Sequence, residues 1–277
     1  MATDTNLTTQ RPLAAITGAT VGIGAEFARR LAREGYDLLL VSRDLARLNA
    51  VADQIREAAN VNVETLSLDL SEDQGNSRLE AELADRPRLE LLVNNAGFLL
   101  KGDLTQADLE GLRRMNTLHM EAPMRACRAA LPGMMQRNKG AIINVASIAG
   151  MVCSPGNINY CSTKAYLIHF SEGLELEMRL AGKKVHIQAL CPGYTRTEIH
   201  ARAGVSPRDI PAGLWLKCAD VVDYSLRMLK TRKVVVVPGG NYRFLTGLLR
   251  LLPRTWVSGL VHREQRVQRR RRANKDS

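Results

Sequence analysis

The sequence predicts a single α/β domain, built on a doubly wound parallel sheet of about seven strands with helices on both faces. Seven short apolar runs, rich in β-branched residues, alternate with longer stretches of helical pattern. Continuous apolar runs are typical of strands buried on both faces, and strand–helix alternation gives parallel pairing with right-handed crossovers. The runs cover residues 12–16, 37–42, 61–68, 89–93, 140–146, 184–190 and 233–237.

The first run leads directly into a glycine-rich loop and then into a helical stretch. Gly18, Gly22 and Gly24 follow Thr17. Glycine permits positive φ and close approach of the backbone, so the N–H groups of such a loop and of the following helix can hold a pyrophosphate. The spacing Gly-x-x-x-Gly-x-Gly differs from the standard Gly-x-Gly-x-x-Gly of dinucleotide sites. The strand before the loop and the helix after it nevertheless favour a nucleotide site.

The residues after the second run, 37–42, indicate which nicotinamide dinucleotide the chain prefers. An acidic side chain at this place bonds the ribose 2′-hydroxyl of NAD, whereas an arginine accommodates the 2′-phosphate of NADP. Arg43 follows Ser42 here and predicts NADP(H) in preference to NAD(H). Asp44, together with the absence of a basic residue at Thr20 or Val21, keeps NAD open as the alternative.

A serine, a tyrosine and a lysine after the fifth run form a candidate proton-transfer set. Tyr160 and Lys164 lie four residues apart, which places the phenol and the ammonium on one face if the stretch is helical. A phenol ionises near pH ~10, and a nearby cation lowers that pKa, so such a tyrosine can exchange a proton with an alcohol oxygen. Ser147 can hydrogen-bond the same oxygen. Taken alone, the Tyr–Lys pair also fits an ordinary solvated helix face.

These motifs together resemble the classical short-chain dehydrogenase/reductase family over residues 12–240. The resemblance implies a Rossmann-like fold and an NADPH-dependent carbonyl reductase, reversibly an alcohol dehydrogenase. It implies a catalytic set of Asn116, Ser147, Tyr160 and Lys164, and no metal. The expected cofactor-binding residues are Thr17, Gly18, Gly22, Ile23, Gly24, Ser42, Arg43, Asp69, Leu70, Asn95, Ala96, Gly97, Tyr160, Lys164, Pro192, Gly193 and Thr195.

The same resemblance implies a role for each catalytic residue. Tyr160 is the general acid during reduction, and Ser147 steadies the developing oxyanion. Lys164 bonds the nicotinamide ribose and lowers the tyrosine pKa, while Asn116 supports a water chain that reprotonates the lysine. At the cofactor, Asp69 contacts the adenine ring, and the turn at Pro192–Gly193 with Thr195 contacts the nicotinamide carboxamide.

An apolar C-terminal end makes the chain look most like the branch of 3-ketoacyl reductases and hydroxysteroid dehydrogenases. This suggests a lipophilic ketone or a 3-oxoacyl-type substrate, with a lid expected at residues 205–216. Three rival functions remain open. They are an NAD-dependent alcohol oxidiser, a cofactor-sensing binding protein without turnover, and a membrane-surface scaffold.

The chain divides into three parts by composition. Residues 1–11 form a polar, flexible N-terminus, 12–240 the catalytic domain, and 241–277 an amphipathic extension with a basic tail. In that extension, leucines at 245, 248, 249 and 252 draw one apolar stripe on a helix. Arginines and a proline interrupt the stretch, so it is too broken to span a bilayer. It can instead cover the substrate cleft, pack on a partner subunit, or rest on a membrane surface.

Charge and cysteine usage narrow the setting in which the protein works. The net charge is +11, and residues 263–277 contribute +5 of it through seven basic and two acidic side chains. Nearly half the excess therefore sits in a short tail, which disfavours a nucleic-acid face. The five cysteines form no Cys-x-x-Cys pair and the histidines have no ligand spacing, with His119 expected in packing. Because residues 1–11 contain no apolar segment and the cysteines form no such pair, we expect a cytoplasmic protein. We also expect a homodimer or homotetramer, and contact with a membrane surface through the C-terminal tail is left open.

Overall fold

The structure is a computed structural model that describes residues 11–199 and 210–251. Most of the expected N-terminal segment, the first part of the expected lid and the basic tail lie outside these residues.

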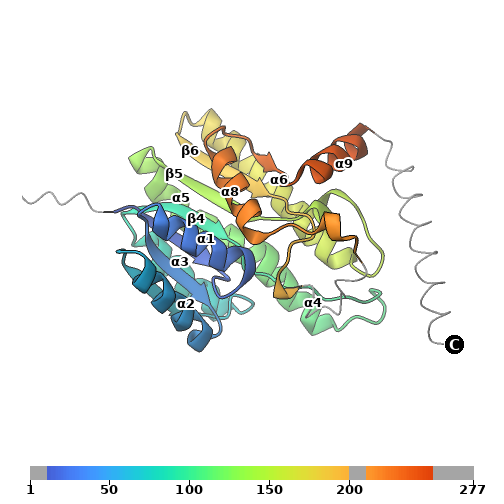
Figure 1. Ribbon diagram of the computed structural model, residues 1–277, viewed down its shortest axis with the longest axis horizontal. Helices are drawn as coiled ribbons and strands as arrows, with labels where there is room; N and C mark the ends of the chain where they lie inside the picture. Colours follow the sequence, from blue (N-terminus) through green and yellow to red (C-terminus); the bar gives the residue numbers. More distant parts are fainter. Residues whose placement is uncertain (1–10, 200–209, 252–277) are drawn as a thin grey trace, which may run out of the picture.

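Seven strands form one sheet in the order β3-β2-β1-β4-β5-β6-β7, and every neighbouring pair is parallel (Figure 1). This confirms the predicted fold class. The order reverses between β1 and β4, and open α/β sheets bind ligands beyond the carboxyl ends of the strands at such a point. The strands are β1 (Leu13–Thr17), β2 (Asp37–Ser42), β3 (Val63–Ser67), β4 (Leu89–Asn94), β5 (Gly140–Val145), β6 (Val185–Leu190) and β7 (Val235–Val236).

Helices cover both faces of the sheet. The structure also contains three short helical segments. η1 (Thr117–Glu121) is a π-helix, while η2 (Ile148–Met151) and η4 (Ala212–Leu214) are 3₁₀ turns. The longer helices are α1 (Gly22–Arg33), α2 (Leu45–Ala58), α3 (Asp73–Ala84), α4 (Leu109–Asn116), α5 (Ala122–Arg137), α6 (Ile158–Leu180), α8 (Cys218–Leu229) and α9 (Gly240–Leu251).

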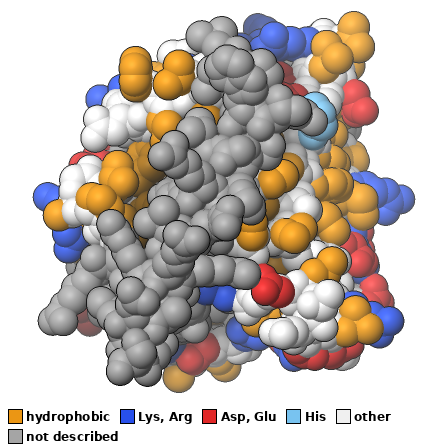
Figure 2. Space-filling view, turned by 90° about the vertical axis from the view of Figure 1, so that its right-hand side faces the viewer, with side chains coloured by type: hydrophobic (Ala, Val, Ile, Leu, Met, Phe, Trp, Pro, Cys, Tyr) orange, Lys and Arg blue, Asp and Glu red, His pale blue; other side chains and the backbone are white. Residues whose placement is uncertain are grey.

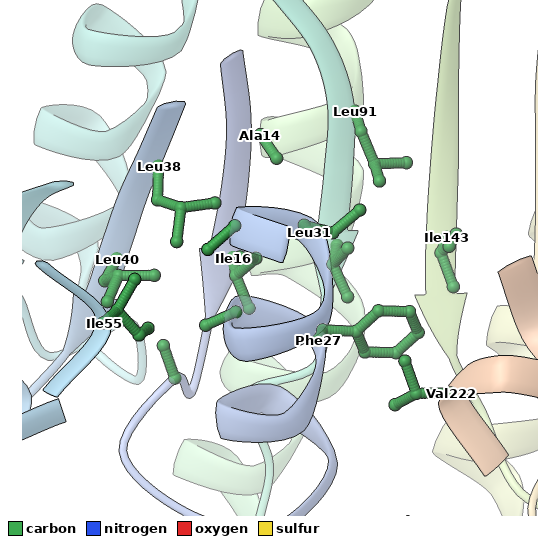
Figure 3. Packing of buried hydrophobic residues seen from close by; sticks show 14 of the residues in the cluster. Ala14, Ile16, Phe27, Leu31, Leu38, Leu40, Ile55, Leu91, Ile143 and Val222 are labelled. Carbon is green, nitrogen blue, oxygen red and sulfur yellow. The ribbon is translucent and has the colours of Figure 1, made fainter. Parts of the chain in front are cut away.

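Alternate residues of each strand serve two separate cores. Ala14 and Ile16 of β1 face α1, α2 and α8, whereas their neighbours in the strand face α3, α5 and α6. Figure 3 shows the first core, in which Phe27 and Leu31 of α1 lie over the sheet and Val222 of α8 lies next to Phe27. Because both faces are buried, the central strands carry apolar side chains at almost every position, which is why they read as continuous runs.

Helix α9 packs differently from the sequence prediction. Over residues 240–249, Tyr242 and Thr246 are the buried residues, while Leu245 and Leu248 of the expected stripe are 45% and 46% exposed. The surface that carries α9 also shows other hydrophobic side chains (Figure 2). Position 252, the last leucine of that stripe, lies outside the described residues. Every helix within the described residues is too short or too polar to span a bilayer.

Candidate active site

A cleft opens beyond the carboxyl ends of the strands, where the strand order reverses. Almost all of the residues expected to bind the cofactor or to take part in chemistry line it. Three lie outside the lining: Thr17 ends β1, Gly24 packs against the Gly18 carbonyl, and Asn116 contacts Asn159, which precedes Tyr160 in the chain. The expected residues that line the cleft are Gly18, Gly22, Ile23, Ser42, Arg43, Asp69, Leu70, Asn95, Ala96, Gly97, Ser147, Tyr160, Lys164, Pro192, Gly193 and Thr195.

The glycine loop has a backbone that other residues would strain. Gly18 and Gly22 have φ of +66° and +61°, in the left-handed region that favours glycine. At Gly24 the restriction is space, because a Cβ would lie 2.3 Å from the Gly18 carbonyl oxygen. The N-cap of α1 is Val21, whose side chain offers no oxygen to the first-turn amides. Those amides therefore remain available for an anion, and the loop fits the pyrophosphate of a dinucleotide.

Thr17 and Asn95 join the glycine loop to the end of β4. The Thr17 hydroxyl accepts hydrogen bonds from the backbone N–H groups of Asn95 (3.0 Å) and Ala96 (3.1 Å). The Asn95 amide donates to the carbonyls of Thr17 (3.0 Å) and Gly18 (3.1 Å). Asn95 thus fixes the glycine loop, because its amide nitrogen bonds two backbone carbonyls of the loop.

Arg43 and Asp44 follow β2, at the end of the cleft where the 2′ position of the cofactor ribose is expected. The Arg43 side chain is 57% exposed, and its guanidinium lies 3.5 Å from the Asp69 carboxylate. Asp44 accepts a hydrogen bond from the Arg47 backbone N–H (3.0 Å) as the N-cap of α2. Since that carboxylate caps a helix, it is a weaker candidate for the ribose 2′-hydroxyl than its sequence position suggested.

Asp69 is held in place by Ser71 of its own loop and by Arg114 of α4. Its carboxylate accepts hydrogen bonds from the Ser71 hydroxyl (2.6 Å) and the Arg114 guanidinium (2.9 Å). Burial acts to raise the pKa of Asp69, but the Ser71 hydrogen bonds and the charges of Arg43 and Arg114 outweigh it and the pKa is lowered. The carboxylate is therefore ionised and fixed at the expected adenine end of the cleft.

Ser147 and Tyr160 meet at the centre of the cleft. Ser147 hydrogen-bonds the Tyr160 phenol, accepts a bond from the Ala149 N–H (3.1 Å) and donates to the Pro192 carbonyl (3.4 Å). Burial raises the pKa of Tyr160 to about 12, and the Ser147 hydrogen bond only partly opposes it. The expected lowering of this pKa is therefore not found, because burial outweighs the favourable contacts. The phenol stays protonated at neutral pH, which suits a proton donor.

Lys164 lies behind the tyrosine with its ammonium turned to the backbone. It is 5% exposed, its Nζ donates to the Val145 carbonyl (2.9 Å), and the same atom lies 5.7 Å from the centre of the Tyr160 ring. Burial lowers the pKa of Lys164 to about 8, against a small opposing effect of Cys191. The i,i+4 spacing on α6 therefore does bring the two groups together on one face.

Asn116 ends α4, at the point where the helix passes into the π-helix η1. Its side-chain oxygen accepts a hydrogen bond from the Asn159 amide (2.9 Å), next to Tyr160 in the chain. π-Helical turns are rare and often occur at functional sites. The contact joins α4 to the start of α6, and its connection to a proton-relay water stays a prediction.

His119 of η1 was expected only to pack, and the structure shows that it is buried and also contacts two polar groups. Its Nε2 accepts a hydrogen bond from the Phe98 N–H (3.1 Å), and its Nδ1 lies 3.0 Å from the Thr163 hydroxyl. Because Nε2 is an acceptor, the proton of a neutral ring sits on Nδ1 and points to Thr163. Burial, with repulsion from Lys164, holds the pKa of His119 well below its ordinary value. The ring packs edge-on to Tyr160 at 5.8 Å, so His119 is a neutral support of the tyrosine.

Thr163 completes that support, since its hydroxyl donates to the Tyr160 carbonyl (2.9 Å). The position of His119 three residues after Asn116 was the available signal, but a lone histidine in a helical stretch does not announce these partners. Among the described residues, no group of three or more His, Cys, Asp or Glu side chains could hold a metal ion.

Comparison with known proteins yields a family match and close structural relatives. The family model described as short chain dehydrogenase matches residues 12–206. The very-long-chain 3-oxoacyl-CoA reductase of Bos taurus is 33% identical over 190 residues, which are 67% of this chain and 60% of that protein. The chain thus spans less than two thirds of that relative's length.

Two solved structures extend the comparison to three dimensions. A short-chain dehydrogenase from Sphingobium yanoikuyae, in complex with NADPH, is 36% identical with a TM-score of 0.78, over 86% of this chain and 94% of that one. The bulky-bulky ketone specific alcohol dehydrogenase from Comamonas testosteroni is 29% identical with a TM-score of 0.74, over 87% and 95% respectively.

Proposed function

We propose that this chain, which belongs to the short-chain dehydrogenase/reductase family, is an NADPH-dependent reductase of a lipophilic ketone or 3-oxoacyl-type substrate. Membership makes it an oxidoreductase that uses a nicotinamide cofactor to interconvert carbonyl and hydroxyl groups. The direction, the cofactor preference and the substrate class are our proposal. In reverse, the same site oxidises the corresponding alcohol.

The observation that carries the proposal is the meeting of Ser147, Tyr160 and Lys164 beside the glycine loop. In reduction, Tyr160 donates its phenolic proton to the carbonyl oxygen, and Ser147 donates a hydrogen bond to the same oxygen as negative charge develops. The bound nicotinamide supplies the hydride. Lys164 holds the nicotinamide ribose, and its charge stabilises the phenolate left after proton transfer. Asn116 supports the water chain that restores the proton.

Arg43 supports the preference for NADPH. Its guanidinium is exposed at the carboxyl end of β2, where the 2′-phosphate of a bound NADP lies in dinucleotide folds. Asp44, the residue that favoured NAD, is engaged as a helix cap. The relative from Sphingobium yanoikuyae was solved with NADPH, which agrees with this preference.

The substrate class rests on the apolar side of the cleft and on the relatives. Phe98, Leu99, Leu118 and Ile199 are apolar residues that line the cleft. Apolar walls of this kind select substrates by buried hydrocarbon area. Two of the relatives are named for a substrate of this class, a very-long-chain 3-oxoacyl-CoA and a bulky-bulky ketone.

A direct assay tests the proposal. Purified full-length protein is mixed with NADPH or NADH and with ketones and 3-oxoacyl thioesters of increasing chain length, and alcohol product is measured by chromatography. We expect product with NADPH, with kcat/KM rising with chain length, and turnover lowered by ~10²–10⁴ in the Tyr160→Phe variant. If NADH binds more tightly than NADPH and alcohol oxidation is faster than ketone reduction, the NAD-dependent alternative is supported. Cofactor binding without any product supports a cofactor-sensing protein.

We also propose that the protein is a cytoplasmic homodimer or homotetramer. Leu176 and Leu180 of α6 are 58% and 80% exposed, and Met124 of α5 is 41% exposed. Contiguous apolar surface marks interaction sites, and Leu176 and Leu180 are neighbours one turn apart on α6. Light scattering after size exclusion measures the mass, and a monomer at working concentration contradicts this part of the proposal.

The C-terminal extension, 241–277, is proposed to end in a basic segment that contacts anionic membrane surfaces. The segment 263–277 carries a net charge of +5 and lies outside the described residues. Basic segments are attracted to anionic lipid by about 1 kcal/mol per charge. Sedimentation with vesicles of anionic and neutral lipid tests this, and equal binding to both contradicts it. The N-terminal residues 1–11 are left outside the catalytic domain of 12–240.

A further inference from the structure

Within residues 240–249 of helix α9, Tyr242 is the most buried side chain, although the sequence pattern had pointed to the leucines. It is 3% exposed and packs in a small core with Ala146, Leu167 and Cys191. Ala146 directly precedes Ser147, and Leu167 lies on the same helix as Tyr160. Helix α9 therefore contacts the segments that carry Ser147 and Tyr160.

The Tyr242 ring lies directly against Gly193, in the turn proposed to contact the nicotinamide. A Cβ built on Gly193 would lie 2.2 Å from Cζ of the ring. Gly193 is not among the glycines of positive φ, so its backbone would accept other residues. The ring of Tyr242 is thus the physical reason why this position holds glycine.

The Tyr242 hydroxyl joins the segment after Gly193, whose Thr195 lines the cleft, to the segment around Leu214. It donates to the Leu214 carbonyl (2.6 Å) and accepts from the Tyr194 N–H (3.1 Å). The same segments are held to each other by backbone bonds from Leu216 N–H to the Tyr194 carbonyl (2.8 Å) and from Arg196 N–H to the Leu216 carbonyl (3.0 Å). A single phenol thereby completes a short, hydrogen-bonded junction between 194–196 and 214–216.

The opposite side of the turn is held by the catalytic serine. The Pro192 carbonyl accepts hydrogen bonds from the Ser147 hydroxyl (3.4 Å) and the Ile148 N–H (3.1 Å). The turn at 192–194 is therefore fixed between Ser147 on one side and Tyr242 on the other. A shift of the tyrosine would move both the turn and the serine that depends on it.

We propose that Tyr242 is a positioning residue for the proposed reductase. Its ring sets the place of the turn at Gly193, and its hydroxyl fixes the substrate-side segment 210–216 to that turn. The role rests on the proposed function, since it assigns the turn to the nicotinamide and the segment to the substrate. It gives α9 a part in specificity that acts through backbone placement, without contact between Tyr242 and the reacting atoms.

The first test removes only the hydroxyl, by Tyr242→Phe in the full chain. Loss of one buried hydrogen-bonding group corresponds to roughly a 3- to 10-fold effect. We expect amide exchange at Tyr194 to speed up by about that factor, and the dissociation constant for NADPH to rise similarly. The KM for bulky ketones should rise more than that for small ones, with kcat nearly unchanged. The matched control is Tyr224→Phe, because Tyr224 contacts the Arg227 and Arg243 guanidinium groups by its ring and has no hydroxyl bond among the described residues.

Unchanged exchange at Tyr194, or unchanged NADPH affinity, in a Tyr242→Phe protein that folds as wild type overturns the proposal. So does an equal effect of Tyr224→Phe. If the wild-type protein reduces none of the carbonyl compounds, the proposed function fails, but exchange and NADPH affinity still decide the role of Tyr242.

A second variant tests the ring contact independently. Gly193→Ala adds a methyl group that points at the Tyr242 ring, and it replaces no residue of the glycine loop and none of the catalytic residues. We expect NADPH affinity to fall by about tenfold or more, because backbone and ring must separate by over 1 Å to reach ordinary van der Waals contact. Affinity and exchange equal to wild type in Gly193→Ala would refute the contact, and with it the proposal.

Discussion

Replacing Lys164 by methionine should stabilise the cofactor-free protein at neutral pH while removing its activity. The ammonium of Lys164 is buried, and burial lowers its pKa from an ordinary 10.5 to about 8. This difference corresponds to a cost of about 3 kcal/mol for keeping the charged form in the folded protein. Methionine fills a similar volume without a charge, but it leaves the Val145 carbonyl without its lysine donor. That loss costs about 1–3 kcal/mol and reduces the net gain.

The pH dependence separates these two effects. Between about pH 8 and 10.5 the unfolded chain binds the lysine proton more strongly than the folded protein does, so wild-type stability rises with pH across this window. The methionine variant lacks this titration. Its stability relative to wild type should therefore fall by about 3 kcal/mol from neutral pH to the upper end of the window, whatever the loss of the Val145 contact costs.

Urea unfolding of both proteins without cofactor, at about pH 7 and about pH 10, measures the effect. Lys184→Met is the control, because Lys184 is exposed and its ammonium is not moved out of water on folding. A stability difference between Lys164→Met and wild type that is the same at both pH values would refute the reasoning. It would mean that the buried ammonium costs nothing in the folded protein.

Four further predictions concern the cofactor, the chemistry and the chain ends. Tyr160→Phe should lower kcat by ~10²–10⁴ and leave NADPH affinity intact, and comparable turnover would contradict its role as general acid. Arg43→Ala should weaken NADPH binding by ~1.5–3 kcal/mol without changing NADH binding, whereas equal losses in a titration with both would mean a structural role. Amide exchange across 210–216, the described part of the expected lid, should slow when NADP and a substrate analogue bind, and unchanged exchange rules out a lid. Ending the chain after Glu264 should leave kcat/KM unchanged and reduce sedimentation with anionic vesicles, and a loss of activity would place the basic tail in the catalytic machinery.

The sequence alone determined the fold class and the place of the site. The seven apolar runs became the seven strands within two residues at nearly every boundary, because strands buried on both faces need apolar side chains at consecutive positions. The parallel order then brings the residues that follow each strand to one edge. For this reason residues as distant as Gly18, Asn95 and Tyr160 could be assigned to one cleft before any coordinates were known.

Only the tertiary structure decided how those residues are tuned. The i,i+4 spacing of Tyr160 and Lys164 predicted proximity correctly, but the direction of the tyrosine pKa depends on burial, which the spacing does not encode. Asp44 appeared to compete for the cofactor ribose until the structure showed it as a helix cap. In each case the sequence gives the group, and the packing of distant segments sets its environment.

The same distinction explains the residues that the sequence concealed. The leucine stripe predicted which face of α9 packs on the domain, but the structure buries Tyr242 instead. Its hydroxyl forms hydrogen bonds with Leu214 and Tyr194, and its ring packs against Gly193. His119 is kept neutral by burial and by the charge of Lys164, and its tautomer is fixed by Phe98 and Thr163, which come from other elements. Local periodicity reports which side chains share a face. What they meet on that face depends on chain segments tens of residues away, and only folding brings those together.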